Sequence, residues 1–315
     1  MNITVLDSAT LGDDITTAAF KRFGNLTVYG GTQADEVCER IVGSDIIVVN
    51  KIKLGEKNLA SAERLKLICV TATGFDNIDL EYCRRRGIAV CNVVGYSTDS
   101  VAQVTLATVL SLASHLPEYT EYVSCGAYSE SGVANRLVPV YHELCGKVWG
   151  IIGAGNIGGR VARCAEALGC TVKVFRKTPR SGLDCVDLET LCRISDVISV
   201  HIPLNGETRG IIDRRHIEMM KDGVIFVNAA RGAVTDEKAL ADAVKSGKIG
   251  ALGADVYSVE PFGREHPFYE IKNMKNVCLT PHMAWGAYEA RKRCIDEIVL
   301  NIQAFTEGAR RNRVD

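Results

Sequence analysis

Short apolar runs rich in β-branched residues recur along the first hundred residues, separated by segments whose apolar positions have helical spacing. The runs are ITVLD (3–7), LTVYG (26–30), DIIVVN (45–50), LKLICV (65–70) and IAVCNV (88–93). The helical segments between them include ADEVCERIVG (34–43) and DLEYCRRRG (79–87). Regular alternation of strands and helices is typical of a parallel sheet covered by helices. The pattern predicts a first α/β domain here.

A second series of the same kind begins at Lys147. Its strand-like runs are KVWGIIG (147–153), TVKVFR (171–176), DVISVHIP (196–203), GVIFVNAA (223–230), IGALGADVY (249–257) and NVCLTPH (276–282). Helical patterns at 156–168 and 236–246 separate some of these runs, and Gly169 and Gly247 stand where the two helices should end. The series predicts a second α/β domain.

The stretch that joins the two series has a different character. Residues 97–100, Ser-Thr-Asp-Ser, are good helix N-caps, and the apolar positions from Val101 to Leu112 predict a long helix that ends near Pro117. Residues 118–146 show no clear periodicity, so we expect a long excursion from the compact body. With 315 residues the chain exceeds the usual size of one hydrophobic core, which favours two domains.

The charge balance and the cysteines narrow the class of protein. Lys and Arg number 37 against 38 Asp and Glu, and the charges are interspersed, which argues against nucleic acid or an anionic membrane as partner. The sequence shows no signal peptide and no apolar stretch of about 18 residues that could cross a bilayer, so we expect a cytoplasmic protein. Its 12 cysteines are scattered and favour reduced thiols, and no cluster of metal ligands emerges.

The segment GAGNIG, from Gly153 to Gly158, has the spacing of a dinucleotide-binding turn. It follows the apolar run 148–152 and begins a helical pattern, which is the context such a turn requires. Gly153 would permit the tight turn, Gly155 would let a pyrophosphate approach the backbone, and Gly158 would let the helix pack on the strand. Asn156 and Ile157 begin the helix, whose N-terminus favours a phosphate. The segment predicts a site for NAD or NADP in a Rossmann domain.

Residues 176–178, Arg-Lys-Thr, follow the second strand of this predicted domain. Many NAD-specific domains place an acidic residue there, which accepts hydrogen bonds from the adenosine ribose. Arg176 and Lys177 supply cations instead, with Thr178 beside them, and this favours the 2′-phosphate of NADP. The alternative is that Arg176 stacks on the adenine and that either cofactor is accepted. The sequence favours NADP slightly over NAD.

Three further strand ends each present one polar group that keto-acid reduction needs. Arg231 follows the run 223–230, Glu260 follows 249–257, and His282 ends 276–282. A planar guanidinium can hold a carboxylate through paired hydrogen bonds, and a histidine can give a proton to a carbonyl oxygen when hydride reaches the carbon. Glu260 would accept a hydrogen bond from the other imidazole nitrogen and favour the protonated ring. Singly each residue has a structural explanation, but three at the carboxyl ends of parallel strands predict an active site.

These segments resemble the signatures of the D-isomer-specific 2-hydroxyacid dehydrogenases, and the likeness extends over nearly the whole chain. The similar segments are TGFDNID (73–79), GYSTDSVA (95–102), GAGNIG (153–158), NAARG (228–232), DVYSVEP (255–261) and LTPHMAW (279–285). The variants ATG (72–74) and HMAW (282–285) resemble glycerate dehydrogenases, also called hydroxypyruvate reductases. The resemblance implies hydride transfer between NAD(P)H and a small D-2-hydroxy or 2-keto acid, of the hydroxypyruvate/D-glycerate or glyoxylate type.

The expected fold is α/β, with two doubly wound parallel-sheet domains. Residues 1–98 with 286–315 would form a flavodoxin-like substrate domain and residues 99–285 the Rossmann domain, with the active site in the cleft between them. The resemblance implies catalysis by Arg231, Glu260 and His282. It implies substrate contacts from these and other residues, namely Thr73, Gly74, Arg231, His282 and Trp285. It also implies cofactor contacts at His201, Pro203, Thr208, Ala229, Ala230 and Asp255, and a homodimer formed through residues 118–146.

Three alternatives remain open at this level. Some relatives of these dehydrogenases act as nucleotide-sensing corepressors on the same scaffold, although the set Arg231, Glu260 and His282 favours an enzyme. A formate- or phosphite-type enzyme fits the segment TPHMAW less well. A phosphoglycerate dehydrogenase is the third, but its longer members carry a regulatory domain, whereas this chain ends about 30 residues after His282.

Overall fold

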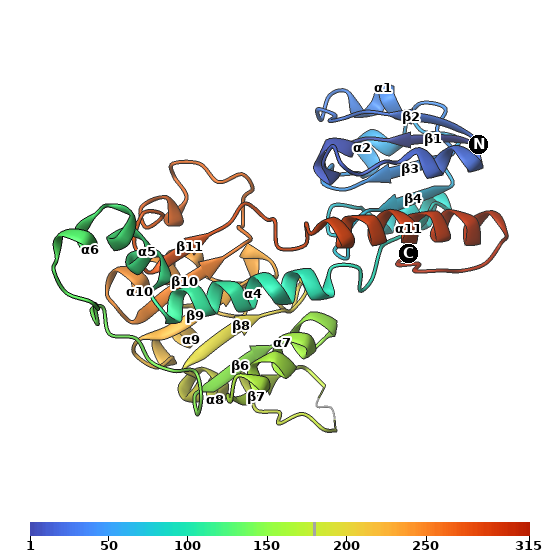
Figure 1. Ribbon diagram of the computed structural model, residues 1–315. Helices are drawn as coiled ribbons and strands as arrows, with labels where there is room; N and C mark the ends of the chain where they lie inside the picture. The colour runs from blue at the N-terminus through green and yellow to red at the C-terminus, as the bar shows by residue number, and fades with distance from the viewer. Residues whose placement is uncertain (179–180) are drawn as a thin grey trace. The chain divides into compact units, whose positions relative to one another are not determined.

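The computed structural model describes residues 1–178 and 181–315, which divide into two compact units (Figure 1). The first unit comprises Met1–Ser97 and Trp285–Asp315, and the second comprises Thr98–Ala284. Each unit is built around one parallel sheet. Among the described helices, none combines the length and the hydrophobicity that a membrane span needs.

All five apolar runs of the first series form strands in the first unit. The strands are β1 (Asn2–Val5), β2 (Asn25–Val28), β3 (Ile46–Val49), β4 (Leu67–Val70) and β5 (Ala89–Cys91). They are parallel and lie in the order β2-β1-β3-β4-β5. This is the strand order of a flavodoxin-like sheet, so the expected fold of this unit is confirmed.

Helices cover both faces of this sheet, which is why its strands β3 and β4 are apolar at every position. On one face lie α1 (Val37–Ile41), α2 (Glu56–Leu59) and α3 (Leu80–Arg86), which contribute buried side chains to one core. On the other face lie the short 3₁₀ helices η1 (Ser8–Leu11) and η2 (Ala18–Phe23) and the long helix α11 (Tyr288–Thr306). The C-terminal segment thus completes the first unit, although nearly 190 residues of the second unit separate it in sequence.

The second unit contains a six-stranded parallel sheet, again from the predicted runs. Its strands are β6 (Val148–Ile152), β7 (Thr171–Phe175), β8 (Val197–Val200), β9 (Val224–Asn228), β10 (Ile249–Ala254) and β11 (Val277–Leu279). They lie in the order β11-β10-β9-β8-β6-β7. All six strands are parallel, but the order in which they are added reverses at β6: the next strand, β7, pairs with one edge of β6, and β8 pairs with the other. Open α/β sheets bind ligands beside the carboxyl ends of strands at such a reversal.

Two layers of helices enclose this sheet. Helices α4 (Thr98–Ala113) and α7 (Asn156–Ala167) pack on one face around the fully buried Trp149. Helices α8 (Leu188–Ile194), α9 (Arg214–Met219) and α10 (Glu237–Lys245) pack on the other. The 3₁₀ helices η3 (Gly232–Val234) and η4 (Pro267–Tyr269) lie in the loops after β9 and β10.

The segment between α4 and β6 differs from the sequence prediction. The helix expected to end near Pro117 ends at Ala113, because His115 adopts a left-handed conformation with φ of 50°. Pro117 instead lies in the first turn of α5 (Leu116–Ser124), where proline needs no hydrogen-bond partner. A further turn, α6 (Ala127–Glu130), follows, so the expectation of no regular structure in 118–146 is wrong for its first part.

Candidate active site

The glycine-rich turn after β6 has the backbone geometry that its sequence predicts. Gly153 has φ of +97°, and a Cβ there would lie 2.6 Å from the Ile202 side chain. A Cβ at Gly158 would overlap the carbonyl oxygen of Gly153, so only glycine lets α7 approach the strand this closely. Around Gly155, by contrast, an added Cβ would meet nothing within 4 Å. The turn therefore leaves space next to its own backbone.

The start of α7 is suited to an anion. Gly155 is the N-cap residue and offers no side chain to the first N–H groups of the helix. Asn156 is exposed and Ile157 is half-buried at this end. Uncapped N–H groups and the helix dipole both favour a phosphate. The turn and this helix end fit the pyrophosphate of a dinucleotide.

Arg176, directly after β7, carries a buried atom without a partner. Its Nη1 is closed off from solvent and has no hydrogen-bond acceptor in the described part of the chain. A buried donor left unsatisfied is costly, so an acceptor from a ligand would be stabilising here. Lys177 differs, because its ammonium lies 2.6 Å from Glu207 and is exposed, as is Thr178. Of the two cations that the sequence offered, only Lys177 pairs with an acidic side chain within residues 1–178 and 181–315.

His201, directly after β8, contacts the hydroxyl of Ser199. Trp149 donates its indole N–H to this hydroxyl, which also lies 3.0 Å from Nε2 of His201. Because a hydroxyl oxygen can accept two hydrogen bonds as well as donate one, the contact fits either neutral tautomer of His201. Burial lowers the pKa of His201 to about 4, so the ring is neutral at pH 7. Nδ1 is closed off from solvent and lacks a partner among the described residues, like Arg176 Nη1.

The other predicted cofactor residues lie in two tight turns. Thr208 donates its hydroxyl to the carbonyl oxygen of Pro203 at 2.6 Å and so shapes the loop after β8. Ala229 and Ala230 begin the turn after β9, where the Asn228 side chain accepts a hydrogen bond from the Ala230 N–H at 3.0 Å. These two turns place backbone N–H and C=O groups next to the carboxyl ends of β8 and β9.

The structure brings Glu260 and His282 into direct contact. Nδ1 of His282 lies 2.6 Å from Oε2 of Glu260, while Oε1 of Glu260 accepts the backbone N–H of Tyr257 at 2.9 Å. Both side chains are partly accessible: 20% of the His282 side chain and 31% of the Glu260 side chain are exposed. Arg231 is half-buried, and its Nη1 donates to the Ala230 carbonyl at 2.8 Å. The three residues follow the adjacent strands β9, β10 and β11.

Asp255 fixes the turn that carries His282. Its Oδ1 accepts the hydroxyl of Thr280 at 2.6 Å and the N–H of Met283 at 2.8 Å, and its Oδ2 accepts the N–H of Ala284 at 2.9 Å. His282 has φ of +51°, a left-handed conformation that costs a non-glycine residue energy and persists only where the surroundings enforce it. Asp255 supplies that enforcement.

Of the predicted substrate residues, Thr73, Gly74 and Trp285 lie in the first unit, whereas Arg231 and His282 lie in the second. Thr73, three residues past the end of β4 and next to Gly74, donates its hydroxyl to the Val93 carbonyl at 2.9 Å. The Asn92 amide donates to the Thr73 carbonyl at 2.7 Å. Trp285 lies edge-on to Tyr96, with ring centroids 6.3 Å apart. The loop at Thr73 is therefore tied to the chain that follows β5.

Two buried acidic residues, one in each unit, hold loops that follow strand ends and were not singled out from the sequence. Asp7, at the end of β1, accepts the backbone N–H groups of Asn50 and Lys51 at 2.9 and 2.7 Å and so holds the loop after β3. Burial raises the pKa of its carboxyl. Glu237, the first residue of α10, contacts the loop that carries Glu260. Asp7 could have been singled out because it ends an apolar run, whereas no feature of the sequence indicates that Glu237 is buried.

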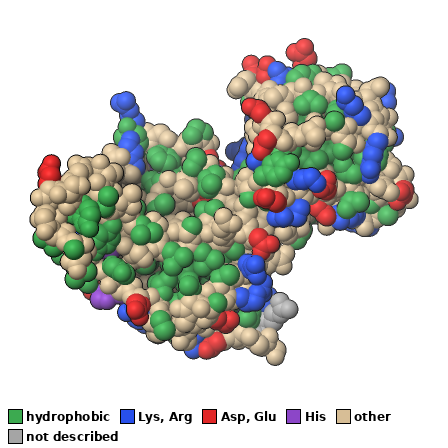
Figure 2. Space-filling view, in the orientation of Figure 1, with side chains coloured by type: hydrophobic (Ala, Val, Ile, Leu, Met, Phe, Trp, Pro, Cys, Tyr) green, Lys and Arg blue, Asp and Glu red, His purple; other side chains and the backbone are tan. Residues whose placement is uncertain are grey.

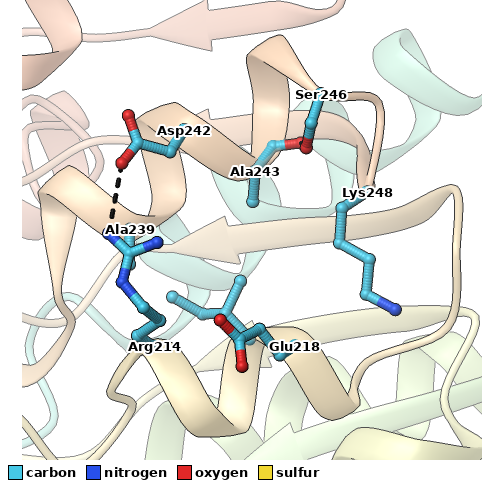
Figure 3. Close-up of a pocket in the computed structure, with 8 residues that line it drawn as sticks. Arg214, Glu218, Ala239, Asp242, Ala243, Ser246 and Lys248 are labelled. Carbon is cyan, nitrogen blue, oxygen red and sulfur yellow. Dashed lines mark hydrogen bonds and ion pairs between the residues drawn. The ribbon is translucent and has the colours of Figure 1, made fainter.

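A separate hollow of about 400 Å³ lies between α9 and α10 (Figure 3). Its charged lining includes Arg214 and Asp242, which pair at 3.1 Å, and Lys248, which pairs with Asp222 at 2.7 Å. Lys248 directly precedes β10, so this hollow lies toward the amino ends of the strands. The residues that the sequence singled out follow the carboxyl ends, and none of them lines it.

Comparison with known proteins agrees with this geometry. Residues 106–284 match the model of the D-isomer specific 2-hydroxyacid dehydrogenase NAD binding domain. A hydroxypyruvate reductase from Blautia hydrogenotrophica is 35% identical over all of both chains. A glycerate dehydrogenase from Methylorubrum extorquens is 35% identical over 89% of this chain and 88% of the relative.

A solved structure shows the same fold over both units. The D-lactate dehydrogenase from Aquifex aeolicus, complexed with NAD and lactic acid, has a TM-score of 0.85 and 30% identity, and the match covers 98% of this chain and 96% of that one. The comparisons and the two sheets confirm the family and the fold that the sequence resembles. The chain belongs to the D-isomer-specific 2-hydroxyacid dehydrogenase family and is a nicotinamide-dependent oxidoreductase of 2-hydroxy acids.

Proposed function

We propose that this enzyme reduces a small 2-keto acid of the hydroxypyruvate or glyoxylate type to the D-2-hydroxy acid, with Arg231, Glu260 and His282 as its catalytic residues. The observation that carries the proposal is the 2.6 Å contact between Glu260 and His282, with Arg231 at the end of the adjacent strand. The substrate class is supported by the names of the hydroxypyruvate reductase and the glycerate dehydrogenase relatives.

Arg231 would bind and orient the substrate. Its guanidinium can form two parallel charge-assisted hydrogen bonds with the carboxylate that every 2-keto acid carries. The bound carboxylate fixes the position of the neighbouring carbonyl group. Thr73, Gly74 and Trp285 are proposed as further substrate contacts on the basis of the resemblance.

His282 would supply the proton and Glu260 would hold it in place. An ionised carboxylate can only accept, so the short contact places a proton on Nδ1 of His282 and leaves Nε2 to exchange a proton with the substrate oxygen. The negative charge of Glu260 stabilises the imidazolium before reduction. Bound reduced nicotinamide supplies the hydride. In the reverse direction the neutral imidazole of His282 removes the hydroxyl proton.

The cofactor would be held by the glycine turn and by two residues that follow β7 and β8, Arg176 and His201. The glycine turn and α7 would take the pyrophosphate, and the Asp255 carboxylate and Nδ1 of His201 would offer polar atoms to the nicotinamide end. Arg176 would meet the adenosine end. Because Nη1 of the half-buried Arg176 has no acceptor among the described residues and a guanidinium suits the 2′-phosphate, we propose NADP over NAD.

A panel of keto acids with both reduced cofactors tests the function. Consumption of reduced cofactor should be fastest with hydroxypyruvate or glyoxylate and slower with pyruvate and 3-phosphohydroxypyruvate. Activity confined to 3-phosphohydroxypyruvate would instead support a phosphoglycerate dehydrogenase. No consumption with any keto acid, together with tight cofactor binding, would support the nucleotide-sensing corepressor.

We also propose that the protein is a homodimer formed through residues 118–146. The segment leaves the body of the sheet (Figure 1), and large apolar side chains gather over α5 and α6 (Figure 2). Leu137 is 72% exposed and Val140 is 67% exposed, and other large apolar side chains of the segment are exposed as well, namely Val123, Tyr128, Val133, Val138 and Tyr141. Exposed large apolar side chains concentrated in one segment are typical of an interface, and a second copy is the commonest partner.

Sedimentation at micromolar concentration should show a species of twice the 34.2 kDa chain mass. Leu137→Asp should shift it toward monomer, because a charge would be desolvated in the interface. Val42→Asp is the matched control: Val42 is 65% exposed at the end of α1 and should leave the dimer intact. A wild-type protein that sediments only as a monomer contradicts the proposal.

The cytoplasm remains the proposed location. The chain carries 12 scattered cysteines, and the thiols of Cys69, Cys83, Cys91, Cys192 and Cys294 are buried among apolar side chains. Buried reduced thiols of this kind are typical of a reducing compartment. Cell fractionation with an antibody against the protein tests this location.

A further inference from the structure

We propose that Glu237, together with His266, is a positioning residue for Glu260, the carboxylate that orients the proton donor His282. It acts by fixing the loop between Tyr257 and His266, on which Glu260 is carried. The proposal rests on the proposed function, because it assigns to Glu237 a part in the reaction that Glu260 and His282 perform.

Glu237 contacts both ends of this loop. Its Oε1 accepts the backbone N–H of Ser258 at 2.9 Å, and its Oε2 accepts the Ser258 hydroxyl and contacts Nε2 of His266 at 2.9 Å. Glu237 and His266 are buried, with side chains 7% and 6% exposed. One carboxylate therefore fastens the loop where it leaves β10 and again where it reaches η4.

The chemistry of the contacts requires a carboxylate at this position. Nδ1 of His266 accepts the N–H of Phe268 at 3.2 Å, so the proton of the ring lies on Nε2 and is donated to Glu237. Oε1 and Oε2 thus receive three donors. A buried carboxylate in this setting is stabilised by its charge-assisted hydrogen bonds and by the first turn of α10, where negative charge is favoured. An amide would turn one acceptor into a donor facing donors.

The fastening is close enough to Glu260 to set its position. Tyr257 N–H binds Oε1 of Glu260, and the next N–H along the chain, that of Ser258, binds Glu237. Gly232 follows Arg231, and a Cβ at Gly232 would overlap the backbone of Tyr257 and Ser258. The loop that carries Arg231 therefore packs directly on the loop that carries Glu260. Residues 258–261 are themselves exposed. Their position therefore depends on what holds the two ends.

The test compares Glu237→Gln with wild type and with Glu260→Gln. Because Glu260 stabilises the imidazolium needed for reduction, Glu260→Gln should move the high-pH limb of kcat for keto-acid reduction to lower pH. Glu237→Gln should move this limb in the same direction by a smaller amount, because the carboxylate of Glu260 remains but is held less firmly. It should lower kcat roughly 10- to 100-fold, because small displacements of catalytic groups are costly. The Kd of the reduced cofactor should stay unchanged.

Glu218→Gln is the matched control, since Glu218 is an exposed glutamate on α9 of the same unit (Figure 3) and should leave kcat and the pH profile as they are. If Glu237→Gln does not fold, His266→Phe serves instead, because it keeps an aromatic ring among Tyr257, Phe262 and Phe268 while removing the donor to Glu237. A folded variant of either kind with an unshifted pH profile overturns the inference. A wild-type protein inert toward every keto acid overturns the proposed function as well, which separates the two failures.

Discussion

Replacing His282 with alanine should lower the turnover of keto-acid reduction by roughly 10²–10⁴-fold, because proton transfer to the substrate oxygen is lost. Binding of the reduced cofactor should persist, since the proposed nucleotide contacts come from other strand ends. Stopped-flow or steady-state kcat and a fluorescence titration of the cofactor measure the two quantities separately.

Two further variants sharpen this result. His282→Asn suits the left-handed backbone at φ of +51° better than alanine does and also lacks a proton to give, so it should be equally slow. His216→Ala is the matched control, because His216 also pairs with a carboxylate, Asp213, at 2.7 Å but follows the N-cap of α9. Turnover of His282→Asn within twofold of wild type would remove His282 from the mechanism.

Substituting Arg176→Asp should erase or reverse a preference for NADPH. A charge-assisted hydrogen bond to the 2′-phosphate is worth roughly 1.5–3 kcal/mol, which corresponds to about 10- to 150-fold in affinity. Because Arg176 is only half-buried, salt screening would bring the effect toward the lower figure. The ratio of kcat/KM for the two cofactors, measured at physiological ionic strength, gives the answer.

Lys177→Gln provides the comparison for this switch. The Lys177 ammonium already pairs with Glu207, so its loss should change the cofactor ratio less than the loss of Arg176. If the wild-type enzyme has a higher kcat/KM with NADH than with NADPH, Arg176 serves another role, such as stacking on adenine, and the NADP proposal is wrong.

The strands could be predicted from sequence because both sheets are parallel and covered on both faces. Runs such as IIVV at β3 are then buried at every position and read as uninterrupted apolar stretches. The break between α4 and α5 could not be predicted in the same way. It depends on the left-handed backbone of His115, whereas the apolar spacing on either side would suit one continuous helix.

The candidate site shows the same division. Motif residues could be located because they follow strand ends, and the contact between Glu260 and His282 agrees with the expected pairing. The residues that hold Glu260 and His282 in position could not be identified from the sequence. Glu237 looks like an ordinary acidic residue in a first helical turn, and only the fold shows that it is buried beneath Ser258 and His266. Asp255 was expected at the cofactor, and its three hydrogen bonds to 280–284 appear only in three dimensions.

The most direct measurement is to incubate the enzyme with hydroxypyruvate and reduced cofactor and to determine the chirality of the product. The account predicts stoichiometric oxidation of the cofactor and formation of D-glycerate, with both lost in His282→Asn. Formation of L-glycerate, or full activity in the His282→Asn enzyme, would contradict it.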